Sequence, residues 1–222
     1  MKRPGNSSIK EKQQQQAREK QVLKELQGKN KQQEKLVMFL AFIVAAVGLV
    51  LYVNTLGHQY ALDDYSLILE NKSTQKGFAG LKEIFKTTYR FGYVLTGDEL
   101  YRPLSKAIFA IQWELAPKNP FLGHFTNVLL YALTGFVMMR VLMNYLQSVS
   151  IAFIASLLFI AHPIHTEVVA NIKSLDEILA LLFNLLTLNC IYLYSKRNSV
   201  KYLIYSFAFF FLALLSKESS IT

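Results

Sequence analysis

Long, charge-poor apolar blocks constrain this 222-residue chain more than any other feature. Four blocks approach the roughly 20 apolar residues that a helix needs to cross a bilayer: Leu36–Val53, Phe121–Leu146, Glu177–Ser195 and Val200–Ser216. A fifth block, Val149–Ala161, is shorter and fits either a short span or a re-entrant segment. The hydrophobic fraction of 52% agrees with membrane insertion rather than with a soluble domain. We therefore predict an all-α multipass membrane protein with about five transmembrane helices.

The distribution of basic residues predicts the orientation of these helices. Residues 1–35 contain ten Lys and Arg against four Asp and Glu, which is +6 of the chain's net charge of +9. The positive-inside rule places this tail in the cytoplasm. Five spans then put residues 54–120 and 162–176 outside, while the short inside loops carry Arg140, Lys196, Arg197 and Lys201. The same charge pattern supports counting residues 149–161 as a span.

Two parts follow from this pattern, a basic Gln/Lys-rich cytoplasmic tail at residues 1–35 and a membrane domain at residues 36–222. The tail lacks the aromatic residues that stack on nucleic-acid bases, so we expect no nucleic-acid partner. A solvated, partly helical lead-in attracted to anionic lipid headgroups is the interpretation we favour. The single cysteine, Cys190, lies inside an apolar block, which excludes a disulfide framework.

The outside segment of residues 54–120 is too long for a plain connector and is expected to fold at the membrane surface. Near its start it carries two adjacent carboxylates, Asp63 and Asp64. Close to a low-dielectric boundary, repulsion and burial raise the pKa of at least one of two such carboxylates, which is the environment of a general base. The alternative is a helix N-cap with a second acidic residue in the first turn.

Two amphipathic helices are predicted further along this segment, in GLKEIFKTTYRFGY and YRPLSKAIFAIQWELA. The second begins at Pro103, a favoured first-turn residue. An apolar stripe recurs along it at helical spacing: Leu104, Ile108, Ile111 and Leu115. We expect both helices to lie flat in the interface, with Trp113 and Tyr101 as aromatic anchors. Arg102 stands where the second helix starts, a position that suits either a phosphate ligand or an ordinary headgroup contact.

The stretch HPIHTE interrupts the apolar sequence with two imidazoles and a carboxylate, those of His162, His165 and Glu167. Their spacing suggests a metal site, but no third strongly preferred ligand lies close by, although His58 and His124 are also predicted to lie outside. The same groups could satisfy a helix end or form a hydrogen-bonding substrate site. We favour the substrate site, because titratable groups at a membrane face are functional by default.

Five motifs follow one another in a characteristic order: YALDDYSLILEN, YRPLS, HFTNVLLYAL, LLFIAHPIHTEVVANIKSLDEILALLF and LLSKESSIT. In this order they resemble the front of the transmembrane and tetratricopeptide-repeat O-mannosyltransferase-like family and its bacterial relatives. The family belongs to the GT-C class of glycosyltransferases, and the resemblance covers about residues 50–222. It implies a GT-C-like N-terminal half with interfacial helices in the first outside loop.

The resemblance implies transfer of a mannosyl or other hexosyl group at the outer membrane face. The donor would be a polyprenyl-phosphate-linked sugar and the acceptor a protein or glycan hydroxyl. It implies that Asp63 or Asp64 acts as base on the acceptor, with a preference for Asp64. The groups expected around the leaving lipid phosphate are Arg102, His162, His165 and Lys217, with Glu167 and Glu218 orienting them. Such enzymes often work without a metal, so we expect neither a metal nor another cofactor.

Two features depart from the family pattern. Relatives commonly carry an arginine where this chain has Leu175, for which Lys173 is the nearby substitute. The chain also stops at Thr222 inside the last motif, which suggests an N-terminal fragment that is inactive alone. The alternative function is a non-catalytic anchoring or assembly protein, or an inactive relic. We expect a bacterial inner membrane, with the endoplasmic reticulum as the alternative; there Asn71, in the sequon Asn-Lys-Ser, would be glycosylated.

Overall fold

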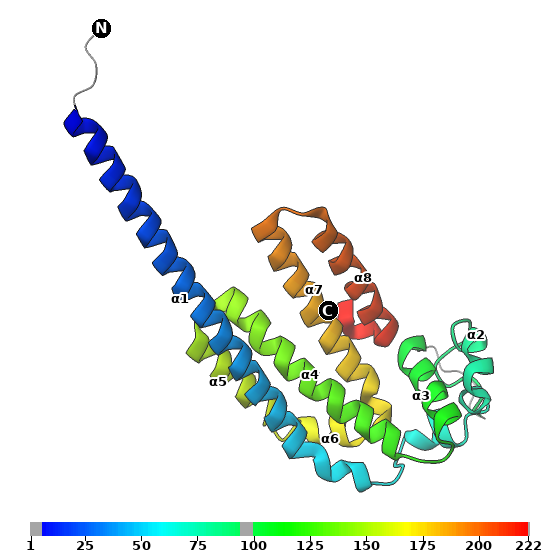
Figure 1. Ribbon diagram of the computed structural model, residues 1–222. Helices are drawn as coiled ribbons and strands as arrows, with labels where there is room; N and C mark the ends of the chain where they lie inside the picture. Colours follow the sequence, from blue (N-terminus) through cyan, green and yellow to red (C-terminus); the bar gives the residue numbers. More distant parts are fainter. Residues whose placement is uncertain (1–5, 94–99, 222) are drawn as a thin grey trace. The chain divides into compact units, whose positions relative to one another are not determined.

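The computed structural model describes residues 6–93 and 100–221, and within these ranges it contains helices and no β-strand. The four longest helices are α1 (Asn6–Tyr52), α4 (Phe121–Leu146), α7 (Leu175–Arg197) and α8 (Val200–Ser216). The shorter helices are α2 (Leu81–Ile84), α3 (Pro103–Leu115), α5 (Val149–Ile160) and α6 (His165–Ala170) (Figure 1). Brief helical turns lie at Val53–Gly57, Tyr65–Leu69, Thr74–Gly80, Ile172–Ser174 and Glu218–Ile221.

Three helices in the described part are long and apolar enough to cross a membrane: Lys20–Gly57, Phe121–Leu146 and Ile172–Arg197. Two shorter apolar helices, α5 and α8, occupy the other two predicted blocks. Helix α5 has 12 residues and is therefore about 18 Å long, well short of the ~30 Å hydrocarbon core. The prediction of an all-α multipass membrane protein is confirmed, and five complete spans stay a prediction.

The prediction of a partly helical tail underestimates the helix. Helix α1 runs without a break through 47 residues, so the tail is helical from Asn6 onward. Gln, Lys and Glu dominate this part and are good helix formers, and no proline follows Pro4 to break it. Along the chain two compact units are distinguished, Met1–Phe39 and Leu40–Thr222. The functional boundary at residue 35 stays a prediction.

Glycines on α4 let neighbouring helices approach closely. A Cβ atom at Gly135 would lie 2.8 Å from Cδ1 of Ile160 in α5 and 3.1 Å from Cγ1 of Val44 in α1. A Cβ atom at Gly123 would lie 2.6 Å from Cγ2 of Ile172. Small residues at such crossings are a general means of packing helices in membranes, where lipid removes most of the hydrophobic driving force between them.

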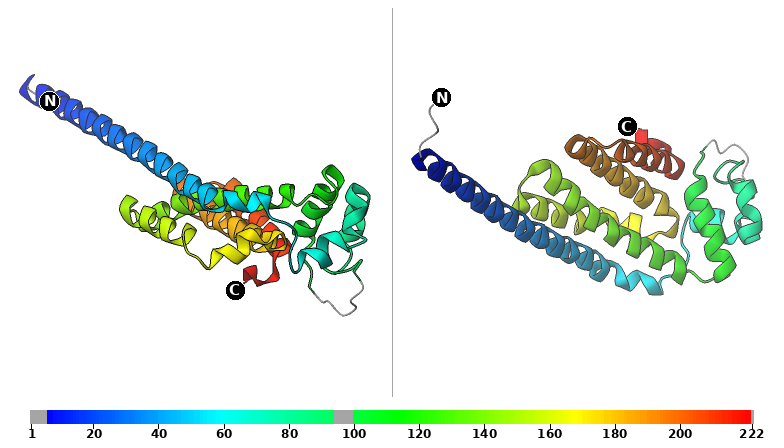
Figure 2. Two further views of the ribbon diagram at one scale, coloured as in Figure 1. Left: turned by 90° about the horizontal axis from the view of Figure 1, so that it is seen from below. Right: turned by 45° about the horizontal axis from the view of Figure 1, so that its top comes forward.

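The two hairpins α4–α5 and α7–α8 turn at residues with left-handed backbone conformation. Gln147 (φ 53°) follows α4, and Asn198 (φ 46°) follows α7. A left-handed residue just past the last turn ends a helix, and the next helix then begins after a connection of only a few residues. As a result, α8 runs back along α7, and the two lie side by side in Figure 1 and Figure 2.

The segment between α1 and α4 folds around a buried apolar cluster that includes Leu67, Tyr89 and Phe109. Of the two amphipathic helices predicted there, α3 forms as expected, but the first yields only the four-residue α2. The predicted stripe of α3 is only part of its buried face. Leu104 and Ile108 are half-buried and pack against this cluster, whereas Leu115 is exposed. The fully buried residues are Pro103, Ser105, Lys106, Ala107, Phe109 and Ala110. The stripe misleads because small and polar residues pack against the turns of the preceding loop.

The predicted glycosylation of Asn71 is wrong for the folded protein. Asn71 is 0% exposed. Its side-chain oxygen accepts hydrogen bonds from the N–H and hydroxyl of Ser73 and from the N–H of Thr74, at 3.1, 2.7 and 3.1 Å. Its side-chain nitrogen donates to the carbonyl of Ser66 at 3.1 Å. The side-chain amide of Asn71 therefore holds the loop in place, and its buried nitrogen has no space for a glycan.

Candidate functional site

Six charged side chains gather where α3 and α7 begin and α8 ends. They are Arg102, Lys173, Asp176, Glu177, Lys217 and Glu218, and we call them the Arg102 cluster. Arg102 precedes the first turn of α3, and Lys217 and Glu218 follow the last turn of α8. The cluster therefore joins three segments that are far apart in the sequence.

Arg102 is the centre of this cluster. Its Nη1 donates to Asp176 Oδ2 at 2.7 Å, its Nε donates to Glu218 Oε2 at 2.8 Å, and its Nη2 donates to Glu218 Oε1. The guanidinium also lies over the ring of Tyr89, 5.6 Å from the ring centroid. These hydrogen bonds, above all those to Glu218, raise the pKa of Arg102 above its ordinary value. The hydrogen bonds from Arg102 in turn lower the pKa of Glu218 to about 2.

The acidic partners differ in burial. Asp176 is 0% exposed, and its carboxylate also accepts the N–H of Glu177 at 2.9 Å and lies 3.6 Å from Lys173 Nζ. The Glu218 side chain is 50% exposed. Lys217 pairs with Glu177, so each of the three cations has an acidic partner. Asp176 was not among the predicted site residues, although an acid at the start of a long apolar helix, in IKSLDE, is the signal that could have found it.

Asp64 links the first long loop to the turn that precedes α7. The residue is 1% exposed, and its Oδ1 and Oδ2 accept the backbone N–H groups of Lys173 and Ala61 at 2.8 and 3.0 Å. Burial, only partly offset by these hydrogen bonds, raises the pKa of Asp64. Asp63 is different, because its side chain is 49% exposed and contacts Arg90 Nη2 at 3.2 Å. Of the two carboxylates, only that of Asp63 is accessible to solvent.

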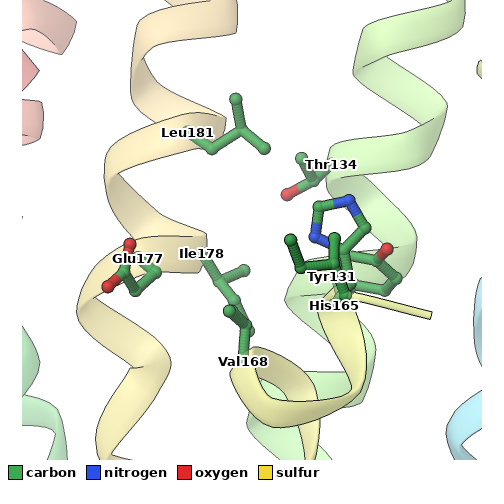
Figure 3. Close-up of a pocket in the computed structure, with 8 residues that line it drawn as sticks. Tyr131, Thr134, His165, Val168, Glu177, Ile178 and Leu181 are labelled. Carbon is green, nitrogen blue, oxygen red and sulfur yellow. The ribbon is translucent and has the colours of Figure 1, made fainter. Parts of the chain in front are cut away.

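A pocket of about 300 Å³ lies between α4, α6 and α7 (Figure 3). Its walls combine apolar groups with a few polar ones: Tyr131, Thr134, Ile164, His165, Val168, Glu177, Ile178 and Leu181. The ring of His165 packs 4.3 Å from that of Phe159, and burial lowers the pKa of His165, which keeps the imidazole neutral near pH 7. Glu177 lines the pocket and also pairs with Lys217, so the pocket adjoins the Arg102 cluster.

Comparison with known proteins identifies relatives for about two thirds of the chain. Protein O-mannosyl-transferase TMTC2 of Mus musculus is 34% identical over 156 residues, which are 69% of this chain and 18% of the relative. TMTC3 of Homo sapiens is 31% identical over 144 residues, 64% of this chain and 15% of that protein. TMTC1 of Mus musculus is 32% identical over 150 residues, 66% of this chain and 16% of that protein. This chain is a homologue of the TMTC protein O-mannosyl-transferases.

The family predicted from the motifs is thereby confirmed. The chain spans less than a fifth of the length of these TMTC relatives. No family model matches the sequence. No solved structure matches it either.

The residues that the TMTC resemblance singled out are divided between two places and the surface. Arg102, Lys217 and Glu218 meet in the Arg102 cluster, and Asp64 adjoins it through the backbone of Lys173. His165 lies in the pocket wall.

His162 and Glu167 are exposed, and His162 Nδ1 accepts the N–H of Ile164 at 3.2 Å, which fixes the turn before α6. Within residues 6–93 and 100–221, no group of three or more His, Cys, Asp or Glu side chains could hold a metal ion. The rings of His58 and His124 lie 6.0 Å apart in an edge-to-face arrangement. The roles assigned to these residues stay predictions.

Proposed function

We propose that the protein is a membrane glycosyltransferase that transfers a mannosyl group from a polyprenyl-phosphate-linked donor to a protein hydroxyl. The relatives named above are all protein O-mannosyl-transferases, which supports the transfer and the protein acceptor. The observation that carries the proposal is the docking of the first long loop on α7. The buried carboxylate of Asp64 accepts the N–H of Lys173, and Arg102 pairs with Asp176, so Asp63 is held at the same end of the helices as the pocket.

In this proposal Asp63 is the general base, in place of the initial preference for Asp64. Its exposed carboxylate takes the proton of the acceptor hydroxyl as the new bond forms between that oxygen and the anomeric carbon of the sugar. The bond from the anomeric carbon to the phosphate oxygen breaks, and the lipid phosphate leaves with the electron pair. Arg90, 3.2 Å from Asp63, orients the carboxylate. The reaction needs no metal for its electron balance.

The pocket beside His165 can bind the apolar chain of the donor at the point where that chain meets the phosphate. Its lining includes Ile178 and Leu181 on one side and Thr134 on the other (Figure 3). A neutral imidazole at its wall can donate a hydrogen bond to a sugar or phosphate oxygen. This arrangement supports a ligand with an apolar chain and a polar head, which is the chemistry of a lipid-linked sugar.

The transfer is proposed to take place on the side of the membrane opposite the basic tail, as the positive-inside rule predicts. The relatives named above are animal proteins, which favours the endoplasmic reticulum over the bacterial inner membrane. The lipid bilayer is then both the solvent of the helices and the source of the donor.

Transfer by Asp63→Asn and Asp64→Asn variants tests the base assignment. The protein is reconstituted in liposomes with a radiolabelled polyprenyl-phosphate mannose and a protein acceptor. The same variants are also measured in a full-length member of the family that carries these residues. We expect Asp63→Asn to lower the transfer rate 10²- to 10⁴-fold, the usual contribution of a general base, without a loss of stability. Glu70→Gln changes an exposed carboxylate of the same loop and serves as the matched control. An unchanged rate in Asp63→Asn would refute the assignment and favour the non-catalytic anchoring alternative.

A further inference from the structure

The turn that contains Asp63 and ends at Asp64 is built on a strained residue. The N–H of Asp64 donates to the carbonyl of Ala61 at 3.0 Å, and the N–H of Ala61 donates to the Asp64 carboxylate, also at 3.0 Å. Residues 61–64 therefore form a closed β-turn in which Leu62 is the first central residue. The φ of Leu62 is 48°, in the left-handed region. Positive φ at this position of a turn favours Gly, Asn or Asp, so a bulky side chain there is strained.

Leu62 is unusual among the residues that share this backbone conformation. Gln147 and Asn198 also have positive φ, but they follow the last turns of α4 and α7, where it is common. Within residues 6–93 and 100–221, Leu62 is the only apolar residue with positive φ, and it is 78% exposed. A glycine would adopt the same backbone without strain. An exposed leucine alone needs no explanation, but one that also strains the backbone points to a contact outside the folded chain.

A second exposed apolar residue, Tyr65, lies on the other side of the proposed base in the sequence. Tyr65 is 46% exposed, and its N–H donates to the carbonyl of Leu62 at 3.4 Å, which brings the two backbones together. We call Leu62 and Tyr65 the apolar rim. Asp63 lies next to Leu62 in the chain, so their Cα atoms are about 3.8 Å apart. A hydroxyl that reaches the Asp63 carboxylate therefore brings its neighbouring groups close to the apolar rim.

We propose that Leu62 determines acceptor specificity, with its side chain packing against an apolar residue next to the serine or threonine that receives the sugar. The inference rests on the proposed function, which assigns Asp63 to the acceptor hydroxyl, and it adds the class of acceptor sequence. Burial of the leucine side chain against an apolar neighbour supplies the contact. The closed turn holds Leu62 in place before the acceptor binds, so binding costs less conformational freedom. A polar neighbour would lose water against the leucine and is disfavoured.

Two acceptor peptides that differ only in the residue beside the threonine, leucine in one and glutamine in the other, test this specificity. In the liposome assay we expect wild type to prefer the leucine peptide about tenfold in kcat/KM, mainly through KM. Leu62→Gly and Leu62→Asn both accept positive φ, so they should unfold no earlier than wild type and yet lose the preference. Leu62→Met keeps an apolar side chain and should keep the preference. Leu115→Asn removes an exposed leucine at the end of α3 and is the matched control.

Protection from thiol labelling tests the same contact without any sugar transfer. Leu62→Cys in lipid nanodiscs is labelled with a water-soluble maleimide, while the native Cys190 is 6% exposed and reacts slowly. At about four times its Kd, the leucine peptide should slow labelling of position 62 about fivefold by mass action. The glutamine peptide at the same concentration should have little effect. Leu115→Cys should be labelled at the same rate with and without either peptide.

The outcomes separate this inference from the proposed function. Protection of position 62 without peptide, by the bilayer or by a later segment of a full-length member of the family that carries these residues, would assign the apolar rim to another contact and overturn the inference. An unchanged preference in Leu62→Gly would do the same, and in either case continued sugar transfer would leave the proposed function standing. Protection by the leucine peptide in a protein that transfers no sugar would leave the acceptor contact standing and refute the proposed function.

Discussion

Removal of the Asp64 carboxylate should destabilise the protein far more than removal of its neighbour. In Asp64→Ala, the N–H groups of Ala61 and of the half-buried Lys173 lose the carboxylate that accepts their hydrogen bonds. A hydrogen bond to a charged group contributes about 1.5–3 kcal/mol, which gives about 3–6 kcal/mol for the two bonds. The variant no longer has to bury a carboxylate, and this gain offsets part of the cost. The same burial raises the pKa of Asp64 in wild type. We therefore expect a net loss of about 2–4 kcal/mol.

Asp63→Ala is the matched control. The Asp63 side chain is 49% exposed and makes one ion pair, with Arg90. Exposed ion pairs contribute about 0–1 kcal/mol, so this variant should unfold close to wild type. The single cysteine supplies the assay, because Cys190 is 6% exposed inside α7 and a thiol-reactive fluorogenic dye will label it only on unfolding. Equal unfolding midpoints for the two variants would refute the role of Asp64 as a clamp.

The pH dependence of the same variants carries a defined sign. Burial raises the pKa of Asp64 in the folded state, so the folded protein binds more protons than the unfolded chain. The stabilisation linked to Asp64 is therefore fully present below the unfolded pKa and is lost as pH rises through the folded pKa. In thermal melts followed by circular dichroism, the difference in midpoint between wild type and Asp64→Ala isolates the Asp64 contribution, and this difference should decrease as pH rises above the ordinary pKa of an aspartate. A difference between wild type and Asp64→Ala that grows as pH rises above the ordinary aspartate pKa would contradict the burial argument.

Three further predictions concern other buried features. Arg102→Met should cost about 3–5 kcal/mol because Asp176 stays buried without its guanidinium, and thermal melts should show partial recovery in Arg102→Met/Asp176→Leu. Gly135→Leu should destabilise the packing of α4 on Ile160 and Val44 by about 1–3 kcal/mol, whereas Gly28→Leu, with nothing within 4 Å of its Cβ, should melt like wild type. Asn71 should carry no glycan after expression in microsomes, so endoglycosidase treatment should leave the gel mobility unchanged; a glycan-dependent shift would contradict its burial.

Periodicity and hydropathy predict the membrane helices well because lipid imposes one rule on every span. Backbone groups in hydrocarbon must be satisfied within the helix, so a long apolar block has few alternatives. Helices α4 and α8 accordingly begin and end at the residues that the apolar blocks indicate. The tail was harder to predict, because Gln- and Lys-rich sequences gain little from burial and their helicity depends on being continuous with the apolar part of the same helix α1.

The outside segment departs most from expectation because its packing is two-sided. An apolar stripe on a surface helix indicates one buried face, but α3 packs against the preceding turns through Lys106 and Ala107 as well. Lys106 is 1% exposed, and its Nζ donates to the carbonyl of Phe91 at 2.7 Å. A buried lysine of this kind is invisible in a hydropathy pattern, because its partner is a backbone carbonyl 15 residues earlier.

The candidate site was only half predictable for the same reason. Residue type and motif order pointed to Arg102, Lys217 and Glu218, which do meet. They could not separate Asp63 from Asp64, because adjacent residues have the same local sequence. The distinction depends on the backbone N–H of Lys173, 109 residues further along the chain. Long-range contacts of this kind decide which carboxylate is buried and which is reachable.

The clamp role of Asp64 changes how activity measurements on the acidic pair must be interpreted. A loss of transfer in Asp64→Asn has two possible sources, a missing base or a loop that has detached from Lys173. The two sources differ in temperature dependence, because a detached loop returns as the sample is cooled below its unfolding midpoint, whereas a missing base does not. If Asp64 is a clamp, the activity of Asp64→Asn, divided by the folded fraction that Cys190 labelling reports, should approach wild type on cooling. Asp63→Asn should stay 10²-fold or more below wild type at every temperature. The reverse pattern would restore Asp64 as the base.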